Sequence, residues 1–528
     1  MPLNQKNPTL TDSWKKLKEH FNLITKQSIE DHFKTNKNRG KEFSTNFNEI
    51  HFDYSKNKIN KETINLFNEL LMEINFSESV KSYFEGDKIN DTESRSVLHT
   101  ALRAKETDEI FVDGVNIMHE VIQSRKKMMD FSDKVISGSY KGMDDAKITD
   151  IVNIGIGGSD LGPSMVCESL SHYKTRLNVH FVNNVDGDQI HEVLKRLTPT
   201  RTLFIIVSKT FTTIETITNA QVAKEWFQSN AKKSDISKNF VGVSSNTKAA
   251  KEFGIHDSNI FPMWDWVGGR FSFWGSVGLA INLSIGSKNF NSLLNGANEM
   301  DDHFKSMPLV NNIPLLAACI TIWYNNFYNY ETHAVIPYNQ NLKFFTAYLQ
   351  QASMESNGKQ TSRNGELIDY QSGNIVWGQV GTNAQHSFFQ LLHQGTKIIP
   401  CDFIGFSNPL SNNIKSHQIL MANFFAQTKA LMMGKKDDNV HKHFGGNRPT
   451  NTILIKKLTP KNLGSLIALY EHKIFSVGVI LNLFSFDQFG VELGKKLAND
   501  ILKDIEQKSS KNSDSSTENL LKKFFDSI

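Results

Sequence analysis

Short apolar runs alternate with longer stretches of helical periodicity along most of the chain, which is the pattern typical of parallel strands separated by helices. Over 119–287 each apolar run ends in polar or glycine-rich residues before the next helical stretch begins. The strands predicted there are Ile151–Ile154, Val179–Val182, Leu203–Val207 and Phe240–Val243. The pattern therefore predicts a first α/β domain with a doubly wound, parallel-rich sheet.

A second pattern of the same kind covers 288–506, after a long apolar helix predicted at Pro314–Tyr328. Helices are expected at 342–351, 384–393 and 415–433. The strands predicted between them are His333–Ile336, Ile375–Trp377, Lys397–Ile404 and Ile453–Ile455. No repeat at the sequence level relates the two halves, so the prediction of two doubly wound domains rests on the pattern alone.

The two ends of the chain differ from this α/β pattern. Residues 1–118 carry apolar side chains at helical spacing among many charges, and they predict a helical region that packs on the second domain. Asn90–Glu93 resembles a capping box that opens a helix running through Arg103. Residues 507–528 are expected to form a flexible tail, since 507–517 is rich in Ser, Lys, Asn and Asp and predicts disorder. Helical periodicity returns over 520–528.

Composition and charge narrow the class of protein. The 528 residues hold 59 basic and 55 acidic side chains, interspersed along the chain, which disfavours a nucleic-acid binder with a basic stripe. No run of about 18 apolar residues predicts a membrane span, and the N-terminus lacks the apolar core of a signal peptide. Three cysteines lie far apart in sequence. A cytoplasmic location is expected, where such thiols stay reduced.

The segment Ser208–Thr213 places four hydroxyls and one lysine directly after a buried strand. In a doubly wound sheet the carboxyl ends of the strands face the ligand. Hydroxyls, an ammonium group and the N–H groups at the start of the next helix suit a phosphate dianion. The alternative is an ordinary helix N-cap, which needs one hydroxyl.

A glycine-rich turn, Gly155–Gly162, follows the first strand and also predicts a ligand loop. It is not a dinucleotide-binding fingerprint, because Asp160 occupies the position of the third glycine. A phosphate-binding P-loop is missing as well, since Ser353 stands where its first glycine would be. A ligand of sugar or phosphate size suits this turn better than a nucleotide.

Two charged side chains are candidates for acid–base chemistry. Glu355 lies where a helical pattern gives way to a loop, and it is a reasonable general base, although a solvated glutamate at a helix end is the alternative. Arg270 stands beside two glycines and several aromatic residues, and it could stabilise an oxyanion without losing its own charge. A structural pair between Arg270 and Asp265 is equally compatible with the sequence.

The histidine and lysine candidates carry a weaker signal. His386 and His393 are one heptad apart without a nearby carboxylate, which makes a poor metal site. Proton transfer by His386 and a plain surface histidine remain open as alternatives. Glu492 and Lys496 can pair along a helix, which would leave Lys495 on another face.

Taken together, these segments resemble the glucose-6-phosphate isomerase family, also called phosphoglucose isomerase. The resemblance spans roughly residues 90 to 500 and keeps the family's order of motifs. Its two longest signatures are Asp265–Ser272 and Asp487–Lys495. The tail beyond about residue 507 departs from the family pattern.

The resemblance implies two sugar-isomerase (SIS-type) α/β domains. It implies the reversible aldose–ketose isomerisation of glucose 6-phosphate and fructose 6-phosphate through a cis-enediolate, in glycolysis and gluconeogenesis, with no metal and no cofactor. The partner expected is a small sugar phosphate, with no nucleic acid and no membrane. A homodimer is also implied, with His386 reaching into the active site of the partner subunit.

The resemblance also assigns roles. Glu355 would move the proton between C2 and C1, Arg270 would stabilise the enediolate, and His386 with Lys495 would open the sugar ring. The residues expected to bind the substrate are Gly158, Ser159, Asp160, Ser208, Lys209, Thr210, Thr213, Gln351 and Gln488.

Three other functions are less favoured. A non-catalytic sugar-phosphate sensor would not need the four catalytic candidates. An aminotransferring relative that makes glucosamine 6-phosphate would need an N-terminal cysteine, whereas residue 2 is Pro. A zinc-dependent mannose 6-phosphate isomerase would need a cluster of metal ligands, which the sequence does not suggest.

Overall fold

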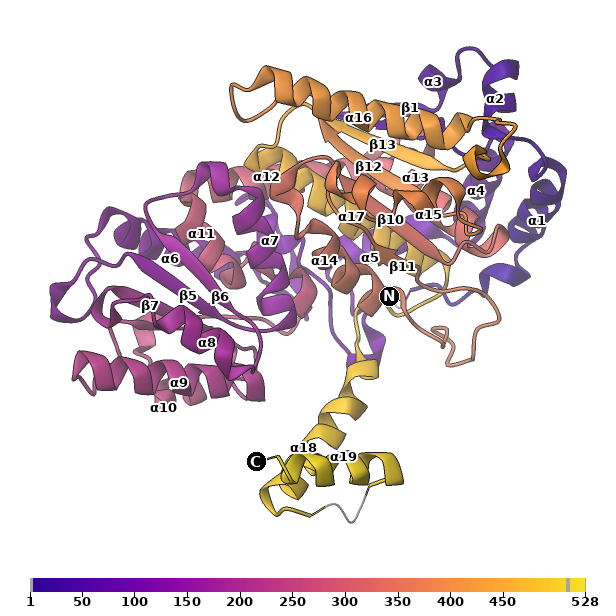
Figure 1. Ribbon diagram of the computed structural model, residues 1–528. Helices are drawn as coiled ribbons and strands as arrows, with labels where there is room; N and C mark the ends of the chain where they lie inside the picture. The colour runs from indigo at the N-terminus through magenta and orange to yellow at the C-terminus, as the bar shows by residue number, and fades with distance from the viewer. Residues whose placement is uncertain (1–2, 510–512, 528) are drawn as a thin grey trace. The chain divides into compact units, whose positions relative to one another are not determined.

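The computed structural model describes residues 3–509 and 513–527, so 510–512 of the segment predicted to be disordered, and Ile528, lie outside the described residues. The chain divides into two compact units, Met1–Ser485 and Phe486–Ile528. The first unit holds both sheets that the sequence predicts (Figure 1).

The first sheet is entirely parallel, with the order β6-β5-β7-β8-β9. Its strands are β5 (Asp150–Ile154), β6 (Asn178–Val182), β7 (Thr202–Val207), β8 (Phe240–Val243) and the short β9 (Ile260–Phe261). The four predicted strands are confirmed, whereas β9 was not predicted. Every residue of β7 and β8 is buried, as expected for a sheet covered on both faces.

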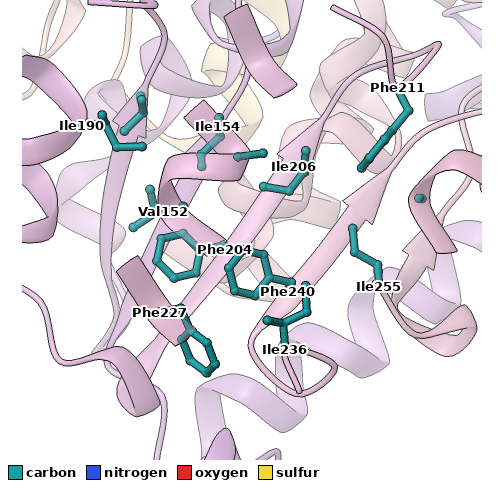
Figure 2. Packing of buried hydrophobic residues seen from close by; sticks show 14 of the residues in the cluster. Val152, Ile154, Ile190, Phe204, Ile206, Phe211, Phe227, Ile236, Phe240 and Ile255 are labelled. Carbon is teal, nitrogen blue, oxygen red and sulfur yellow. The ribbon is translucent and has the colours of Figure 1, made fainter. Parts of the chain in front are cut away.

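Helices cover both faces of this sheet. The helices on one face are α8 (Gly187–Leu194), α9 (Ile214–Ala231) and α10 (Thr247–Phe253), and those of the other layer are α6 (Met118–Ser137), α7 (Leu161–Ser169) and α11 (Leu279–Ile285). Phe204 of β7 and Phe240 of β8 stack with ring centroids 4.7 Å apart, and Phe227 of α9 meets Phe240 edge-on (Figure 2). This apolar core fixes the strands whose ends carry the candidate ligand loops.

The second sheet is mixed, with the order β1-β2-β13-β12-β10-β11. Its strands are β1 (Ser44–Phe47), β2 (Ile50–Asp53), β10 (Thr332–Pro337), β11 (Ile375–Trp377), β12 (Cys401–Phe406) and β13 (Thr450–Ile455). The four C-terminal strands are parallel and were predicted. The hairpin β1–β2 was not predicted, and β2 pairs antiparallel with β13. The N-terminal region is therefore not helical throughout.

Helices pack on both faces of the second sheet and bury its apolar side chains. They are α12 (Ser287–Ser306), α13 (Ile313–Ile322), α14 (Phe345–Gln350), α15 (Phe389–Gln394), α16 (Ile414–Met433) and α17 (Pro460–Ile480). Phe403 of β12 packs with α15 and α16, while the adjacent Asp402 accepts a hydrogen bond from Tyr470 of α17, so these helices lie on opposite faces. Among the described residues, α17 alone has the length and apolar composition of a membrane span, and it is buried inside the protein.

The segment from Asn90 to Arg103 is not the helix that its capping box predicts. It forms two single turns of 3-10 helix, η2 (Asp91–Glu93) and η3 (Ala101–Arg103). Ser94 has φ of 54°, which ends the first turn, and the Asn90 side chain donates to the Glu93 carboxylate instead of capping a helix. The remaining N-terminal elements are α1 (Asp12–Ile24), α2 (Ile29–Thr35), α3 (Arg39–Glu42), α4 (Lys61–Glu73), α5 (Phe76–Glu85), β3 (Phe111–Val112) and β4 (Val115–Asn116).

The second unit contains η17 (Phe489–Val491), α18 (Glu492–Glu506) and α19 (Ser515–Phe525). The start of α19 corrects the prediction of disorder up to Thr517. Asp514 caps this helix by accepting hydrogen bonds from the N–H groups of Ser516 and Thr517. A capped helix end was hidden by the polar composition of the segment.

Candidate active site

The first sheet has its topological switch point between β5 and β7. In chain order its strands follow the arrangement 2-1-3-4-5, for which ligands bind at the carboxyl ends of the first and third strands. These two ends lead directly into Gly155–Asp160 and into Ser208–Thr213. The topology therefore brings the two predicted ligand loops to one edge.

Hydrogen bonds to its backbone and the burial of one side chain hold the loop Ser208–Thr213 in place. The carbonyl oxygen of Lys209 accepts hydrogen bonds from the hydroxyls of Ser244, at 2.9 Å, and of Ser245, at 2.6 Å. Phe211 has φ of 57° and its ring is buried in the core of the first sheet, which turns the loop back over the strand ends. Thr210 remains exposed. The loop is thus ordered before any ligand arrives.

The hydroxyls of this loop are not used as an ordinary helix cap. Thr213 is the N-cap of α9, yet its side chain makes no capping hydrogen bond to a described residue. Instead, its hydroxyl accepts a hydrogen bond from the Ser208 hydroxyl at 3.1 Å. The N–H groups of the first turn of α9 therefore keep their capacity for an anion, which favours the phosphate interpretation over the simple cap.

Lys209 carries the positive charge of the loop. Its ammonium group lies 3.1 Å from the carboxylate of Asp265. Burial lowers the pKa of Lys209, and Asp265 opposes this shift. The carboxylate of Asp265, which the sequence offered as a partner for Arg270, thus lies against Lys209.

The glycine turn after β5 forms a short 3-10 helix, η5 (Gly157–Ser159), which contacts η9 (Gly269–Trp274). A Cβ atom on Gly158 would lie 2.2 Å from the Gly269 carbonyl oxygen, so only glycine allows this approach. A Cβ on Gly157 would lie 3.2 Å from the side-chain nitrogen of Gln351. The turn thus brings three separate segments of the chain together.

Asp160 closes the same turn and is buried. Its carboxylate accepts a hydrogen bond from the Asn183 amide at 2.7 Å. Burial raises the pKa of Asp160 to about 6, and the Asn183 hydrogen bond opposes the shift only in part. Ser159 is half-buried beside it, and its carbonyl oxygen accepts from the Asn153 amide.

Arg270 and Glu355 face one another. The Nη1 atom of Arg270 lies 3.6 Å from Oε2 of Glu355, and the arginine side chain is 2% exposed against 21% for the glutamate. The Nε of Arg270 donates to the Ser356 hydroxyl at 2.8 Å, and Nη2 donates to the carbonyl oxygen of Ser485 at 2.6 Å. A fixed guanidinium therefore stands beside a carboxylate that solvent can still reach.

Glu355 ends a π-helical turn, η14 (Gln351–Glu355), which continues from α14. Such turns are rare and occur frequently at functional sites. The turn places Gln351 and Glu355 on one short segment. The Oε1 atom of Gln351 is buried and has no hydrogen-bond partner among the described residues, and the same holds for one oxygen each of Asn153 and Asp160. These atoms leave hydrogen-bonding capacity for a polar ligand.

The predicted site residues outside this group are His386, Gln488 and Lys495. His386 ends the short helix η15 (Asn383–His386) and is exposed. Gln488 is half-buried just before η17, and Lys495 is exposed on α18. Both belong to the unit Phe486–Ile528, which is described by itself.

Two residues that help to build the site were not predicted. Ser356 orients Arg270, and Asn183 holds Asp160. Ser356 follows Glu355 directly, so its proximity was visible in the sequence, but its partner was not. Asn183 comes straight after β6, at the same sheet edge as the ligand loops. Within the described ranges, no group of three or more His, Cys, Asp or Glu side chains forms a metal-binding cluster.

Comparisons with known proteins show the family to which the chain belongs. The family model of phosphoglucose isomerase matches residues 53–521. The chain is 53% identical to a glucose-6-phosphate isomerase of Christiangramia forsetii, and 52% identical to one of Wigglesworthia glossinidia brevipalpis, with 98% of each chain covered in both comparisons. The crystal structure of a glucose-6-phosphate isomerase from Chlamydia trachomatis superposes with a TM-score of 0.89 at 32% identity, covering 99% of this chain and 100% of the other. The chain belongs to the phosphoglucose isomerase family.

Proposed function

We propose that this protein interconverts glucose 6-phosphate and fructose 6-phosphate by proton transfer, with Glu355 as the base that moves a proton between C2 and C1. The observation that carries the proposal is the 3.6 Å approach of Arg270 Nη1 to Glu355 Oε2. A carboxylate takes the proton from carbon, and the neighbouring guanidinium offsets the negative charge that develops on the enediolate oxygens. Arginine keeps its charge throughout, so it stabilises the intermediate without taking part in proton transfer.

The phosphate group of the substrate is the anchor in this proposal. Ser159, Ser208, Thr210 and Thr213 supply hydroxyls, Lys209 supplies a charge, and the first turn of α9 supplies backbone donors. Gly158 leaves room for the backbone to approach the ligand, while Asp160 supports the turn. With the phosphate held at the end of β7, the sugar extends towards Gln351, Arg270 and Glu355. Arg270 lies in η9, which η5 contacts, and Gln351 begins the turn that ends at Glu355 and approaches Gly157 of η5.

Ring opening falls to His386 with Lys495, and Gln488 joins Gln351 in holding the sugar. We place His386 in the active site of a partner subunit, so the working enzyme is a homodimer. The exposure of His386 supports this role, because an exposed imidazole is available to a second chain. On α18, Leu493 and Leu497 are at least half exposed within this chain, as expected for a helix covered in an assembly. We also propose a cytoplasmic location, in keeping with three free cysteines.

The test is the conversion of fructose 6-phosphate to glucose 6-phosphate by the purified protein, with and without excess EDTA. Conversion that EDTA does not change is expected. Conversion abolished by EDTA would contradict the metal-free mechanism, and binding of sugar phosphate without conversion would favour a sensor. If His386 acts across the interface, the active protein should sediment as a dimer. Its activity should be lost when dilution separates the dimer into monomers.

A further inference from the structure

A buried cluster of charged side chains lies behind the candidate active site, and the proposed reaction does not use it directly. Its centre is Glu471, on the buried helix α17 and 2% exposed. The carboxylate pairs with Arg103 of η3, which in turn donates to both oxygens of Asp301 at 2.9 and 2.7 Å. His472 contacts Asp301 at 2.7 Å. The cluster therefore joins three parts of the first unit: η3, α12 and α17.

The ionisation of this cluster follows from its burial. Burial raises the pKa of Glu471, and the charge of Arg103 offsets only part of that shift. Burial acts on Asp301 in the same direction, but Arg103 and His472 outweigh it and bring the pKa of Asp301 to about 2. Asp301 and Glu471 both lie against the guanidinium of Arg103, and the second oxygen of Glu471 accepts hydrogen bonds from neutral donors.

Those donors come from the two segments that carry the catalytic candidates. Oε1 of Glu471 accepts a hydrogen bond from the indole Nε1 of Trp274 at 2.8 Å, and a longer one from the Tyr348 hydroxyl at 3.4 Å. Trp274 is the last residue of η9, the turn that contains Arg270. Tyr348 lies in α14, which continues into the π-helical turn ending at Glu355. One carboxylate oxygen is therefore shared between the Arg270 segment and the Glu355 segment.

Ring contacts reinforce the same connection. The guanidinium carbon of Arg103 lies 4.6 Å from the centre of a ring of Trp274. The imidazole of His99 stacks on Phe271, the residue after Arg270, with ring centroids 4.6 Å apart. Phe273 meets Tyr348 edge-on at 5.9 Å. The two segments are thus packed on one another as well as hydrogen-bonded to a common acceptor.

We propose that Glu471 is a positioning residue that sets the separation between Arg270 and Glu355. This inference rests on the proposed function, since it assigns those two side chains to one reaction. Glu471 acts on them through Trp274 and Tyr348, which donate hydrogen bonds to its carboxylate. Because a misplacement of about 1 Å can cost on the order of 100-fold in rate, a shared acceptor between the two segments affects kcat more than substrate binding.

The test begins with Glu471→Gln, which keeps an oxygen acceptor but not the charge. We expect kcat for fructose 6-phosphate to fall by about tenfold, with KM changed less than twofold. Trp274→Phe removes only the indole donor to Glu471 and should also lower kcat. In combination with Glu471→Gln it should add little, because Glu471→Gln weakens and Trp274→Phe removes the same hydrogen bond. Rates are expressed per folded protein, measured by near-UV circular dichroism.

Asp402→Asn is the matched control, because Asp402 is equally buried and hydrogen-bonded to Tyr470, the residue before Glu471. It should lower the melting temperature without lowering kcat. If Glu471→Gln lowers only the melting temperature, or lowers kcat no more than Asp402→Asn does, the positioning role is wrong.

A crystal structure of Glu471→Gln gives a readout that does not depend on activity. We expect the separation of Arg270 Nη1 and Glu355 Oε2 to change from 3.6 Å. An unchanged separation would overturn the inference even if kcat had fallen. Failure of the wild-type protein to isomerise fructose 6-phosphate would instead count against the proposed function, and the structural readout would still decide the inference.

Discussion

The two sheets share their strand order but differ in what their carboxyl edges carry. In each, the first parallel strand lies between the second and the third, and the fourth follows the third. At the first sheet the switch point opens on Ser208–Thr213, with its lysine and hydroxyls. At the second it opens on Tyr338–Asn341 and Asn408–Ser411, which line a cavity of about 500 Å³ with two histidines and no lysine or arginine in its lining. Strand order decides where a ligand can bind, and the loop side chains decide which ligand.

This difference also shows how the second half contributes to the site. Its own switch point is not the source of Glu355 and Gln351, which come from the π-helical turn after α14. That turn approaches the glycine loop of the first sheet. In the proposed mechanism, the first half anchors the phosphate and the second half supplies the base.

The sharpest test of this division of roles is Glu355→Gln, which removes the base and keeps the shape. We expect kcat to fall by about 10³-fold while fructose 6-phosphate still binds, since the anchor lies in the other half. Glu366→Gln, at an exposed glutamate in the loop that follows, is the control and should leave kcat unchanged. Near-normal turnover by Glu355→Gln would remove Glu355 from its role.

The close approach of η5 to η9, which carries Arg270, is tested by Gly158→Ala. The added Cβ would lie 2.2 Å from the Gly269 carbonyl oxygen and must push η9, with Arg270, away from the glycine loop. We expect kcat/KM to fall on the order of 100-fold. Gly187→Ala, where a Cβ meets nothing within 4 Å, should have no such effect. Wild-type kinetics for Gly158→Ala would show that the close approach is not needed.

The two sheet edges can be compared at one matched position. Lys209 is the second residue after β7, and Asn408 is the second residue after β12. Lys209→Ala should raise KM by about tenfold to a hundredfold with a small effect on kcat, because a charge-assisted hydrogen bond to the phosphate contributes about 1.5–3 kcal/mol. Asn408→Ala should leave both constants unchanged. Equal effects of the two variants would contradict the assignment of the phosphate to the first sheet.

The smallest expected effect concerns acid stability. All six buried histidines among the described residues (His20, His32, His99, His303, His333 and His472) lie outside 119–287. Burial lowers the pKa of His303 to about 4, and His472 adds to the shift, while Nε2 of His303 accepts the N–H of Ile313. The unfolded chain takes up this proton near pH 6.5, so stability is present above that pH and is lost as the pH falls from 6.5 towards 4.

Hydrogen exchange at pH 7 and pH 5 measures this difference between the regions. We expect protection in α12 and α17 to fall more than protection in β5 and β7. His303→Gln, which keeps an acceptor for Ile313, should reduce the change in α12. Equal loss of protection in both regions would contradict the prediction.

Much of the fold followed from periodicity, because buried parallel strands such as β7 are continuous apolar runs. The hairpin β1–β2 was missed although Ile50 and Phe52 alternate with polar residues, since two strands of four residues are a weak signal beside the surrounding helices. The prediction of a helix over Asn90–Arg103 was wrong. The capping box indicated a helix start, but the left-handed backbone at Ser94 ends the first turn, and the capping box gives no sign of it.

Some features of the candidate site could likewise be predicted from the sequence, and others could not. The hydroxyl cluster and the glycine turn were visible because each follows a predicted strand. The pairing of Lys209 with Asp265, and of Arg270 with Ser356, joins residues 56 and 86 positions apart and depends on the packing of the chain. The sequence did not predict a role for Glu471, because its neighbours in an apolar helix give no sign of Trp274 or Tyr348 as donors.

The most direct test of the central claim is the conversion of fructose 6-phosphate in D₂O containing EDTA, with the product analysed by NMR. Proton transfer through Glu355, whose side chain is 21% exposed, predicts glucose 6-phosphate that accumulates deuterium at C2 over repeated turnovers. Rapid conversion with no deuterium at C2, however long the reaction runs, would indicate a hydride shift between the carbons and would contradict the account.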